Sequence, residues 1–555
     1  MVTVFGRERS KERIVARHCR LVTTRNVGVV PVRLLSRITP KQKSELRTDS
    51  MKNIVAILLV TTLLNHSLAP SSLSYENRRE HPYLASSSHS NSPDKIPSSI
   101  HDLTRKAYLW GWPLVYLTNV QRAAALIKRP GISGGAPVAP VNRLSMLTEP
   151  VSPDFKSVPC PNPDVIYGFS ILDLSEDAVV LQVPDLSDRF WMVQLGDHRT
   201  DSFGELGCMY GSKPGFYMIV GPNWRGVAPS SIVQVFRSST SLAYLIPRVL
   251  TRSQNDVIRV QSALSEISVT PLSKWSGQWK RHDWTKRKWY PAIGESTRSR
   301  CKSVHPATFF ADLSNVLDAV PPLEGEETFY EEMRSLLHAA QHNDALMAEL
   351  QERARELEST LIEPLFDFSR ISNPLPTGWT SVSNGAAFGT DFVTRAAVAK
   401  SNIFVNRANE AKYFYLEADG QGESLQGSRD YSITFPKGAL PPHQGFWSLT
   451  AYNSDHRLEP KDHAPYALLG SPDNLSYNED GSLTISISQQ KRPSIRSNWI
   501  TPPPGRFVLY LRIYVPDEPV LSGAWVPPSV AVEPTVSNQG LLVSVTPNID
   551  SNDAR

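Results

Sequence analysis

The chain has 555 residues, and because a single hydrophobic core stops growing near ~250–300 residues, we expect at least two domains. Its 40% hydrophobic and 20% charged residues are ordinary for a globular protein, and its 44 Pro against 30 Gly indicate turns and strand edges, which excludes both disorder throughout and an all-helical bundle. The net charge of +4 arises in residues 1–50, where 12 basic side chains accompany 4 acidic ones, so the remaining chain is slightly acidic and predicts no nucleic-acid partner.

The N-terminal region predicts an export signal. Met51 and Lys52 precede the apolar run 54–64, and a small-residue exit follows at 65–70, which is the pattern of a secretory signal. We therefore predict a leader over 1–69, with the signal at 51–69, translation from Met51 and a secreted or extracytoplasmic protein. Two alternatives stay open: the Arg-rich opening is an organelle transit peptide, or 54–64 is a buried strand. No other stretch approaches ~20 consecutive apolar residues, so we predict no transmembrane span.

The next segments predict a first β-domain. Residues 70–98 are rich in Ser, Asn and Pro and predict a disordered stalk. Apolar residues then recur every three or four positions over 100–127, which indicates an amphipathic helix kinked at Pro113. Short runs separated by turn residues predict an antiparallel sandwich within a domain spanning 99–272. The expected strands are 165–172, 178–183, 190–195, 215–220 and 231–236, with a helix after the last of them.

Residues 273–306 form a basic, Trp-rich insertion in this prediction. Between 274 and 290 indole rings alternate with Lys and Arg, a composition that can stack on sugars, bases or lipid headgroups. The alternative, which we favour, is a surface segment whose Trp rings pack on the parent domain.

The remaining chain predicts helices and then a second β-domain. Helical periodicity over 307–365 places a helical segment and linker at 307–406, and strands return after residue 407. Asp-Gly turns at 419–420 and 480–481 mark hairpins in a second sandwich or jelly roll spanning 407–530, before a loose tail at 531–555. The expected strands of this domain are 412–416, 431–435, 446–452, 482–487 and 507–514.

The four cysteines allow at most one disulfide in the mature chain. Cys19 falls in the leader, which leaves Cys160, Cys208 and Cys301. Cys160 with Cys208 is the favoured pair because both lie in one predicted domain, and three thiols are the alternative. No standard zinc or nucleotide motif is present, so we predict no metal and leave any cofactor unknown. Asn474 begins the one N-glycosylation sequon outside the predicted leader, as expected of an exported chain.

Two sets of motifs carry a family resemblance. The first half resembles the family called domain of unknown function 1254 through YLWGWPLV at 108–115, PNPDVIY at 161–167, DHRTDS at 197–202 and GPNW at 221–224. That family usually has Thr where this chain has Val165, which puts in doubt any chemistry that needs the hydroxyl.

The second half resembles the companion family 1214. The motifs are PPHQGFWSLTAY at 441–452, DGSL at 480–483, NW at 498–499 and LRIY at 511–514. Together the two resemblances cover about 100–530. They imply a mainly β protein with helical segments: an N-terminal immunoglobulin-like β-sandwich, a central helical segment and a C-terminal jelly-roll-like β-sandwich. Proteins of this pairing are mostly bacterial and exported, without an established reaction.

One polar cluster in the first domain is a candidate catalytic site. Asp164 and Tyr167 lie three residues apart at the start of a strand, and Asp197, His198 and Arg199 follow another strand. Converging carboxylates, an imidazole and a phenol can act as general acid and base, or the aspartates can hold a hard cation. The alternative, which we favour, is that these groups cap turns and pair loops.

Candidate ligand-binding residues lie in the second domain. Alternation along 446–452 puts Trp447 on one face of a strand and Tyr452 on the other, with His443 beside this hairpin. Arg512 sits on an apolar strand, and if it faces inward it needs a partner such as Asp419 or Glu417. The His spacing matches no metal motif.

Two functions remain open from the sequence. The first is a secreted protein that binds a carbohydrate, a small molecule or another cell-envelope ligand. The second is an exported hydrolase or lyase that uses the Asp164, Tyr167, Asp197, His198 and Arg199 cluster in a cleft between the domains. Convergence of those side chains in one pocket favours the enzyme, and carboxylates that each cap their own turn favour binding.

Overall fold

The computed structural model describes residues 98–155, 158–290, 304–370, 372–401, 404–464, 467–491 and 498–534. The predicted leader, the stalk up to residue 97, Cys301 and the tail from 535 lie outside the described residues. Residues 93–555 form one compact unit. Within its described part, no helix has the length and apolar character needed to cross a membrane.

The first β-body is a sandwich of two four-stranded sheets. Val193, Leu245 and Val249 of one sheet pack against Leu181 and Ile219 of the other, and all are buried. Pairing within each sheet is antiparallel except between β7 and β8. The strand order of the first sheet is β3 (Ser145–Met146), β4 (Val165–Asp173), β9 (Leu242–Leu250) and β6 (Trp191–Asp197), and that of the second is β10 (Ser268–Pro271), β5 (Val179–Val183), β7 (Gly215–Val220) and β8 (Ile232–Arg237).

Strand β9 corrects the prediction of a helix directly after the strand at 231–236. It is a central strand, and the expected helix, α3 (Gln254–Glu266), follows it. All nine residues of β9 are buried, so the strand shows no alternation of apolar and polar residues. Pro247 also argues against a central strand because proline cannot donate to the ladder. These two features hid the strand from pattern reasoning.

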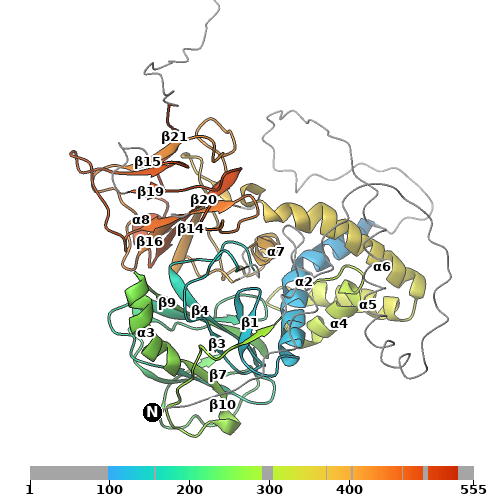
Figure 1. Cartoon of the computed structure of the whole chain (residues 1–555). Helices are drawn as coiled ribbons and strands as arrows, with labels where there is room; N and C mark the ends of the chain where they lie inside the picture. The colour runs from blue at the N-terminus through green and yellow to red at the C-terminus, as the bar shows by residue number, and fades with distance from the viewer. Residues whose placement is uncertain are drawn as a thin grey trace, which may run out of the picture. The chain divides into compact units, whose positions relative to one another are not determined.

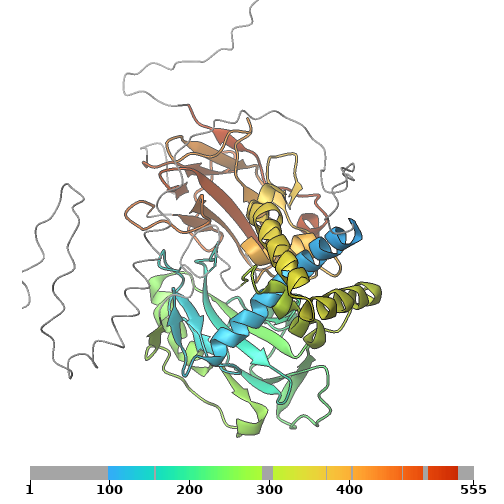
Figure 2. The same cartoon turned by 90° about the vertical axis from the view of Figure 1, so that its right-hand side faces the viewer.

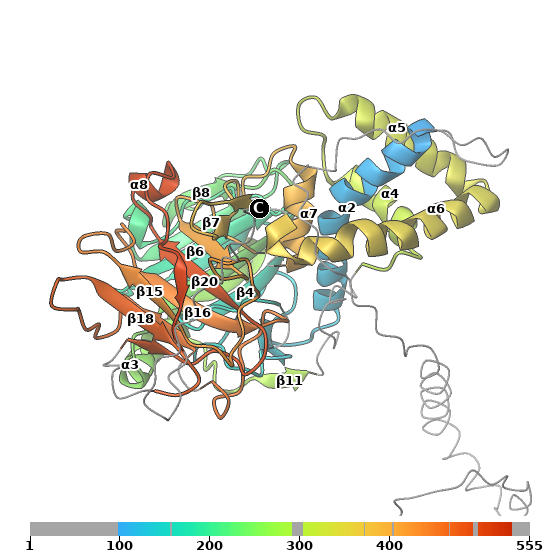
Figure 3. The same ribbon diagram turned by 90° about the horizontal axis from the view of Figure 1, so that it is seen from above.

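The helices form a separate layer beside the sandwiches. Trp110 and Trp112 of α2 (Ser98–Ala125) are fully buried in a core shared with the later helices, and α2 continues through Pro113. At Gly111 the helices approach so closely that an added Cβ would lie 2.4 Å from the Leu313 side chain. Figures 1, 2 and 3 show α2 and the later helices of this layer, between residues 309 and 401, gathered on one side of the β-bodies. The later helices are α4 (Phe309–Ala319), α5 (Glu327–Gln341), α6 (Asp344–Leu357) and α7 (Phe392–Ser401).

The second β-body is also a two-sheet sandwich. Trp447, Leu449 and Ala451 point into its core, whereas Phe446 packs outside that core, which confirms the predicted alternation of this strand. The short helix α8 (Glu518–Leu521) follows the last long strand. One sheet has the order β12 (Asn373–Pro374), β13 (Thr380–Ser381), β14 (Ala411–Leu416), β20 (Phe507–Tyr514), β16 (Trp447–Asn453), β17 (Leu468–Gly470), and the other β19 (Trp499–Ile500), β18 (Leu483–Ile487), β15 (Tyr431–Phe435), β21 (Val530–Val532).

The Trp-rich segment packs on the first sandwich. The rings of Trp275 and Trp279 lie 5.1 and 5.2 Å from that of Phe216, and buried Trp284 donates from its indole N–H to the Leu264 carbonyl at 2.8 Å. The segment ends in β11 (Lys288–Tyr290), which pairs in parallel with β1 (Gly131–Ser133), itself paired with β2 (Ala136–Val138). Packing therefore accounts for most of these rings.

The two sandwiches contact each other through the outer face of the β3–β4–β9–β6 sheet of the first and the outer face of the six-stranded sheet of the second. Met192 and Leu250 of the first body share a buried cluster with Phe446 and Tyr514 of the second. The ring of Phe190 lies 5.3 Å from that of Phe446 and 5.2 Å from that of Tyr514. These two contacting sheets are thus buried on both faces. Polar groups on their outer faces must therefore find partners inside the protein.

Candidate functional site

The predicted catalytic residues fall in two different places. Asp197 lies at the end of β6 and caps its own turn: its carboxylate accepts from the backbone N–H groups of Arg199 and Asp201 at 2.9 and 3.1 Å, and from the Ser239 hydroxyl at 2.6 Å. Burial raises the pKa of Asp197, and the neighbouring Asp201 carboxylate adds to that rise. Its oxygens are committed to the turn.

His198 and Arg199 join this turn to the helical layer. The Nε2 atom of buried His198 lies 2.9 Å from the Leu114 carbonyl, so we assign the ring proton to Nε2, from which it donates. Burial lowers the pKa of His198 to about 4, so the ring is neutral at pH 7. Buried Arg199 donates to the Pro321 carbonyl and lies 4.0 Å from the Glu326 carboxylate. Both side chains have a structural role.

Asp164 lies instead at the contact between the sandwiches. The Ser448 hydroxyl of the second body donates to its carboxylate at 2.5 Å, and burial raises its pKa to about 6. Tyr167 is the third residue of β4, the strand that follows Asp164, and it lines the pocket described below. The structure therefore does not gather the five predicted catalytic residues in one cleft.

Arg512 and Tyr452 belong to the same contact as Asp164. The Arg512 guanidinium donates to the Cys160 carbonyl at 3.0 Å, the Tyr452 hydroxyl at 2.9 Å and the Thr450 hydroxyl at 3.1 Å. Tyr452 in turn donates to the Pro161 carbonyl at 2.7 Å. Arg512 thus points away from its own core, and the predicted partners Asp419 and Glu417 are wrong.

The favoured disulfide is also wrong. Cys160 and Cys208 are not joined, and the Cys160 thiol lies 2.7 Å from the Tyr510 hydroxyl, which is 2.6 Å from Nδ1 of His456. Ser448 and Tyr510, which we did not predict as site residues, also lie at this contact. The alternation of β16 and β20 places Ser448 and Tyr510 on the faces of Tyr452 and Arg512, and this signal was available.

The four predicted ligand-binding residues do not share one surface. Trp447 is 1% exposed in the core of the second sandwich, so it cannot stack on a ligand as an open aromatic surface. It lies on the opposite face of β16 from Tyr452, and Arg512 is buried with Tyr452. His443 borders a shallow cavity near Asp473 and Leu475, and burial lowers its pKa.

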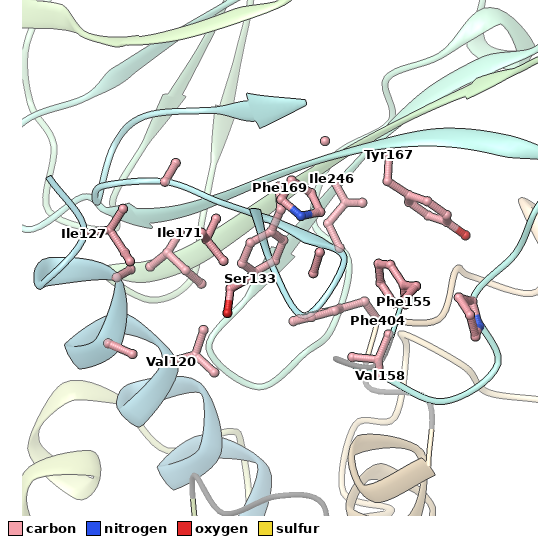
Figure 4. A pocket seen from close by; sticks show the side chains of 18 of the residues that line it. Val120, Ile127, Ser133, Phe155, Val158, Tyr167, Phe169, Ile171, Ile246 and Phe404 are labelled. Atoms are coloured by element: carbon pink, nitrogen blue, oxygen red, sulfur yellow. The ribbon is translucent and has the colours of Figure 1, made fainter. Parts of the chain in front are cut away.

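An apolar pocket lies beside the first sandwich. Its volume is about 220 Å³, and it lies between α2, the β1–β2 hairpin, the segment before β4, and the outer face of β4 and β9. Figure 4 shows Val120 of α2 and Ile127, just after this helix, facing Phe169, Ile171 and Ile246 of the sheet across this space. The lining is Tyr116, Val120, Ala123, Ala124, Ile127, Ser133, Ala136, Pro137, Val138, Ala139, Phe155, Val158, Pro159, Cys160, Pro161, Tyr167, Gly168, Phe169, Ile171, Ile246, Arg248 and Phe404.

Local strand geometry explains why the pocket lies there. Tyr167, Phe169 and Ile171 alternate along β4 and so point to the same outer face. The β4–β9 ladder pairs Tyr167 with Arg248 and resumes at Ser170, and the interruption coincides with Pro247, which has no N–H to donate. An added Cβ on Gly168 would lie 2.1 Å from the Met146 sulfur, so glycine is required beside this gap.

The pocket contains a single charged side chain among its described lining residues, Arg248. It is 4% exposed, and its Nη2 donates to the Phe404 carbonyl at 2.8 Å. No group of three or more His, Cys, Asp or Glu within the described ranges is arranged to hold a metal ion. The site is therefore a small apolar chamber with one cation in its wall.

We expect opposite pH signatures from His198 and Asp164. The folded pKa of His198 is lowered to about 4 from 6.5, so stability is fully present above pH 6.5 and is lost as pH falls towards 4. The folded pKa of Asp164 is raised to about 6 from 3.8, so stability is fully present below pH 3.8 and is lost as pH rises towards 6. Each shift of two or more units corresponds to about 3 kcal/mol.

Single variants separate these two contributions. Urea titrations at a series of pH values give the free energy of unfolding of each protein. As the pH is lowered from 7 to 4, the wild-type value minus the His198→Gln value should fall. Over the same range, the wild-type value minus the Asp164→Asn value should rise. Parallel curves for wild type and a variant would show that the replaced group does not titrate as described.

The fold and the site define a two-sandwich protein with an apolar chamber beside its first sheet. Residues 141–271 match the family described as "Protein of unknown function (DUF1254)", and residues 410–518 match "Protein of unknown function (DUF1214)". The two matches follow the N-terminal and C-terminal order that the motifs indicated.

Comparison with solved structures supports the fold. The crystal structure of the VPA0106 protein from Vibrio parahaemolyticus aligns over 78% of this chain and 99% of its own, with a TM-score of 0.55 and 20% identity. A putative uncharacterized protein from Burkholderia cenocepacia aligns over 78% of this chain and 96% of its own, with a TM-score of 0.39 and 12% identity, too distant to carry an argument. No curated protein matches the sequence.

Proposed function

We propose that this protein binds a small, mainly apolar molecule in the chamber between α2 and the outer face of β4 and β9. The observation that carries the proposal is the composition of the wall, in which apolar side chains from α2, the β1–β2 hairpin and the sheet converge. Its volume of about 220 Å³ exceeds that of an apolar cavity of ~150 Å³ known to take up benzene. Enclosed apolar clefts with few polar groups are the usual form of small-molecule sites.

An apolar cell-envelope molecule suits this wall better than a carbohydrate does. A sugar carries a hydroxyl on almost every carbon, and each buried hydroxyl without a partner is costly. Besides Arg248, the polar side chains of the described lining are Ser133, Cys160, Tyr116 and Tyr167. We therefore keep the predicted binding function and narrow its ligand class to apolar molecules.

The hydrolase or lyase alternative has no assembled site behind it. Asp197 serves its own turn, His198 and Arg199 contact the helical layer, and Asp164 contacts the second sandwich. We accordingly propose no reaction. An extracytoplasmic location remains our proposal on the strength of the apolar run at 54–64, which lies outside the described residues.

Filling the chamber tests the binding proposal. Ala124 lines the chamber on α2, and the Ala124→Trp indole would fill much of its volume of about 220 Å³. If a ligand loses contact for at least two or three methylene groups, at ~0.8 kcal/mol each, its affinity falls thirtyfold or more, so affinity for 1-octanol should fall at least about thirtyfold in isothermal titration calorimetry.

The matched control is Ala125→Trp. Ala125 is the next residue of the same helix, is exposed, and is not part of the lining. It should leave octanol affinity within about twofold of wild type. Equal affinity in both variants, or no octanol binding by the wild-type protein, would contradict the proposed site.

A further inference from the structure

The chain places one arginine in a wall that is otherwise uncharged. Arg248 lies on β9 opposite Tyr167 of β4 and Met192 of β6, and it shares its outer face with Ile246, two positions earlier. It is 4% exposed, and its guanidinium carbon lies 5.7 Å from the centre of the Tyr167 ring. A permanent positive charge is thus held beside apolar side chains, away from bulk water.

The hydrogen-bonding capacity of this guanidinium is only partly used. Nη2 donates to the Phe404 carbonyl, whereas Nη1 is buried and has no hydrogen-bond partner among the described residues. No carboxylate of the described residues lies within 4.0 Å of the Arg248 guanidinium. Glu410, the carboxylate that influences Arg248 electrostatically, already accepts from the Tyr210 hydroxyl at 2.9 Å and the Arg407 N–H at 3.1 Å.

Other buried arginines of the protein differ from Arg248. Arg395 forms an ion pair with Asp201 at 2.8 Å, and Arg199 lies 4.0 Å from Glu326. Arg512 donates to three oxygens and lies near the Asp164 carboxylate. Arg395 and Arg199 also have buried N–H groups without a partner, so the feature that sets Arg248 apart among these is the lack of a nearby carboxylate in the described residues. Because a buried charge is costly unless it is paired, such a guanidinium in the wall of a ligand-sized chamber indicates that the ligand completes it.

We propose that the ligand is an apolar carboxylic acid whose carboxylate pairs with Arg248 while its apolar body lies against Phe169, Ile171 and Ile246 (Figure 4). This inference rests on the proposed function and names the class of molecule bound. The planar guanidinium matches a carboxylate, and a single cation in the lining suits a monoanion better than a phosphate dianion. An amine headgroup would be repelled by the same charge.

Three eight-carbon probes with different headgroups test the inference on the full-length wild-type protein. Octanoate, 1-octanol and octylamine have the same apolar body and are anionic, neutral and cationic at pH 7.5. In isothermal titration calorimetry octanoate should bind roughly ten- to a hundredfold more tightly than octanol, since a hydrogen bond to a charged group is worth that ratio. Octylamine should bind most weakly.

Variants of Arg248 supply the matched comparison. In Arg248→Met the ratio of octanoate to octanol affinity should fall to about one, whatever the change in octanol affinity itself. Arg248→Lys keeps the charge and should retain part of the preference for octanoate. If Arg248→Met does not fold, the headgroup series on wild type together with Arg248→Lys still decides.

The outcomes distinguish this inference from the function on which it rests. If wild type binds octanol and octanoate equally, the carboxylate assignment is wrong and the apolar site stands. If Arg248→Met still prefers octanoate, Arg248 is not the partner, and the inference is overturned. If none of the three probes binds wild type, both the proposed function and the inference fail.

Discussion

Replacing Arg512 by leucine should lower the free energy of unfolding by about 3–5 kcal/mol. The guanidinium donates to the Cys160 carbonyl and to the hydroxyls of Thr450 and Tyr452, and all of these groups are buried between the sandwiches. Leucine would leave these oxygens without their donor, at about 1–3 kcal/mol for each unsatisfied group. It would also remove the positive charge that opposes the rise in the pKa of Asp164.

Urea unfolding at pH 7 measures this loss. Arg512→Lys should be intermediate, because one ammonium group cannot reproduce the forked geometry. Arg506→Leu is the control, since Arg506 is exposed just before the same strand, and it should change stability by less than about 1 kcal/mol. An Arg512→Leu protein as stable as Arg506→Leu would show that this network does not hold the two sandwiches together.

Replacing Lys400 by methionine should cost a similar amount, about 3–5 kcal/mol, in the helical layer. The Lys400 side chain is 1% exposed on α7, and its ammonium lies 3.2 Å from the carboxylate of Glu358. That carboxylate also accepts from the Tyr108 hydroxyl at 3.0 Å and the Trp112 indole N–H at 2.8 Å. Removing the lysine leaves a largely buried carboxylate without its counter-charge.

A double-mutant cycle isolates the ion pair. Glu358→Gln keeps an acceptor for Tyr108 and Trp112 while removing the negative charge, so Lys400→Met combined with Glu358→Gln should be more stable than Lys400→Met alone. Arg355→Met is the control, because the Arg355–Glu352 pair on α6 is exposed and should be worth less than about 1 kcal/mol. Additive effects of the two single variants would mean that Lys400 and Glu358 do not interact.

Pattern reasoning succeeded where one face of a strand is apolar and the other is not. Strands β14, β16 and β20 have a core face and an outer face with different side chains, so their period of two is visible in the sequence. It failed at β9, which has apolar side chains on both faces and contains Pro247. The outer face of β9 is covered by segments that are distant in the sequence, so the local sequence does not show that this face is buried.

The candidate sites show the same division. For these polar residues the sequence favoured roles in capping turns and pairing loops, and in the structure Asp197 caps its own turn, whereas Asp164 contacts the second sandwich and His198 contacts α2. The spacing of residues in the sequence does not show which of these three partners a polar side chain contacts. Phe404 completes the pocket from a segment more than 150 residues beyond Arg248, so the pocket was not visible as a motif.

The sequence by itself determined the pairing of families, the two β-rich bodies and the alternation of their strands, because these depend on neighbouring residues and on short motifs. Only the tertiary structure decided which buried charges are paired and where a chamber remains. Arg512 meets Cys160 across 352 positions of the chain, and Arg248 meets Phe404 across 156. The free energy of a buried charge depends on such distant partners, and the local sequence does not encode them.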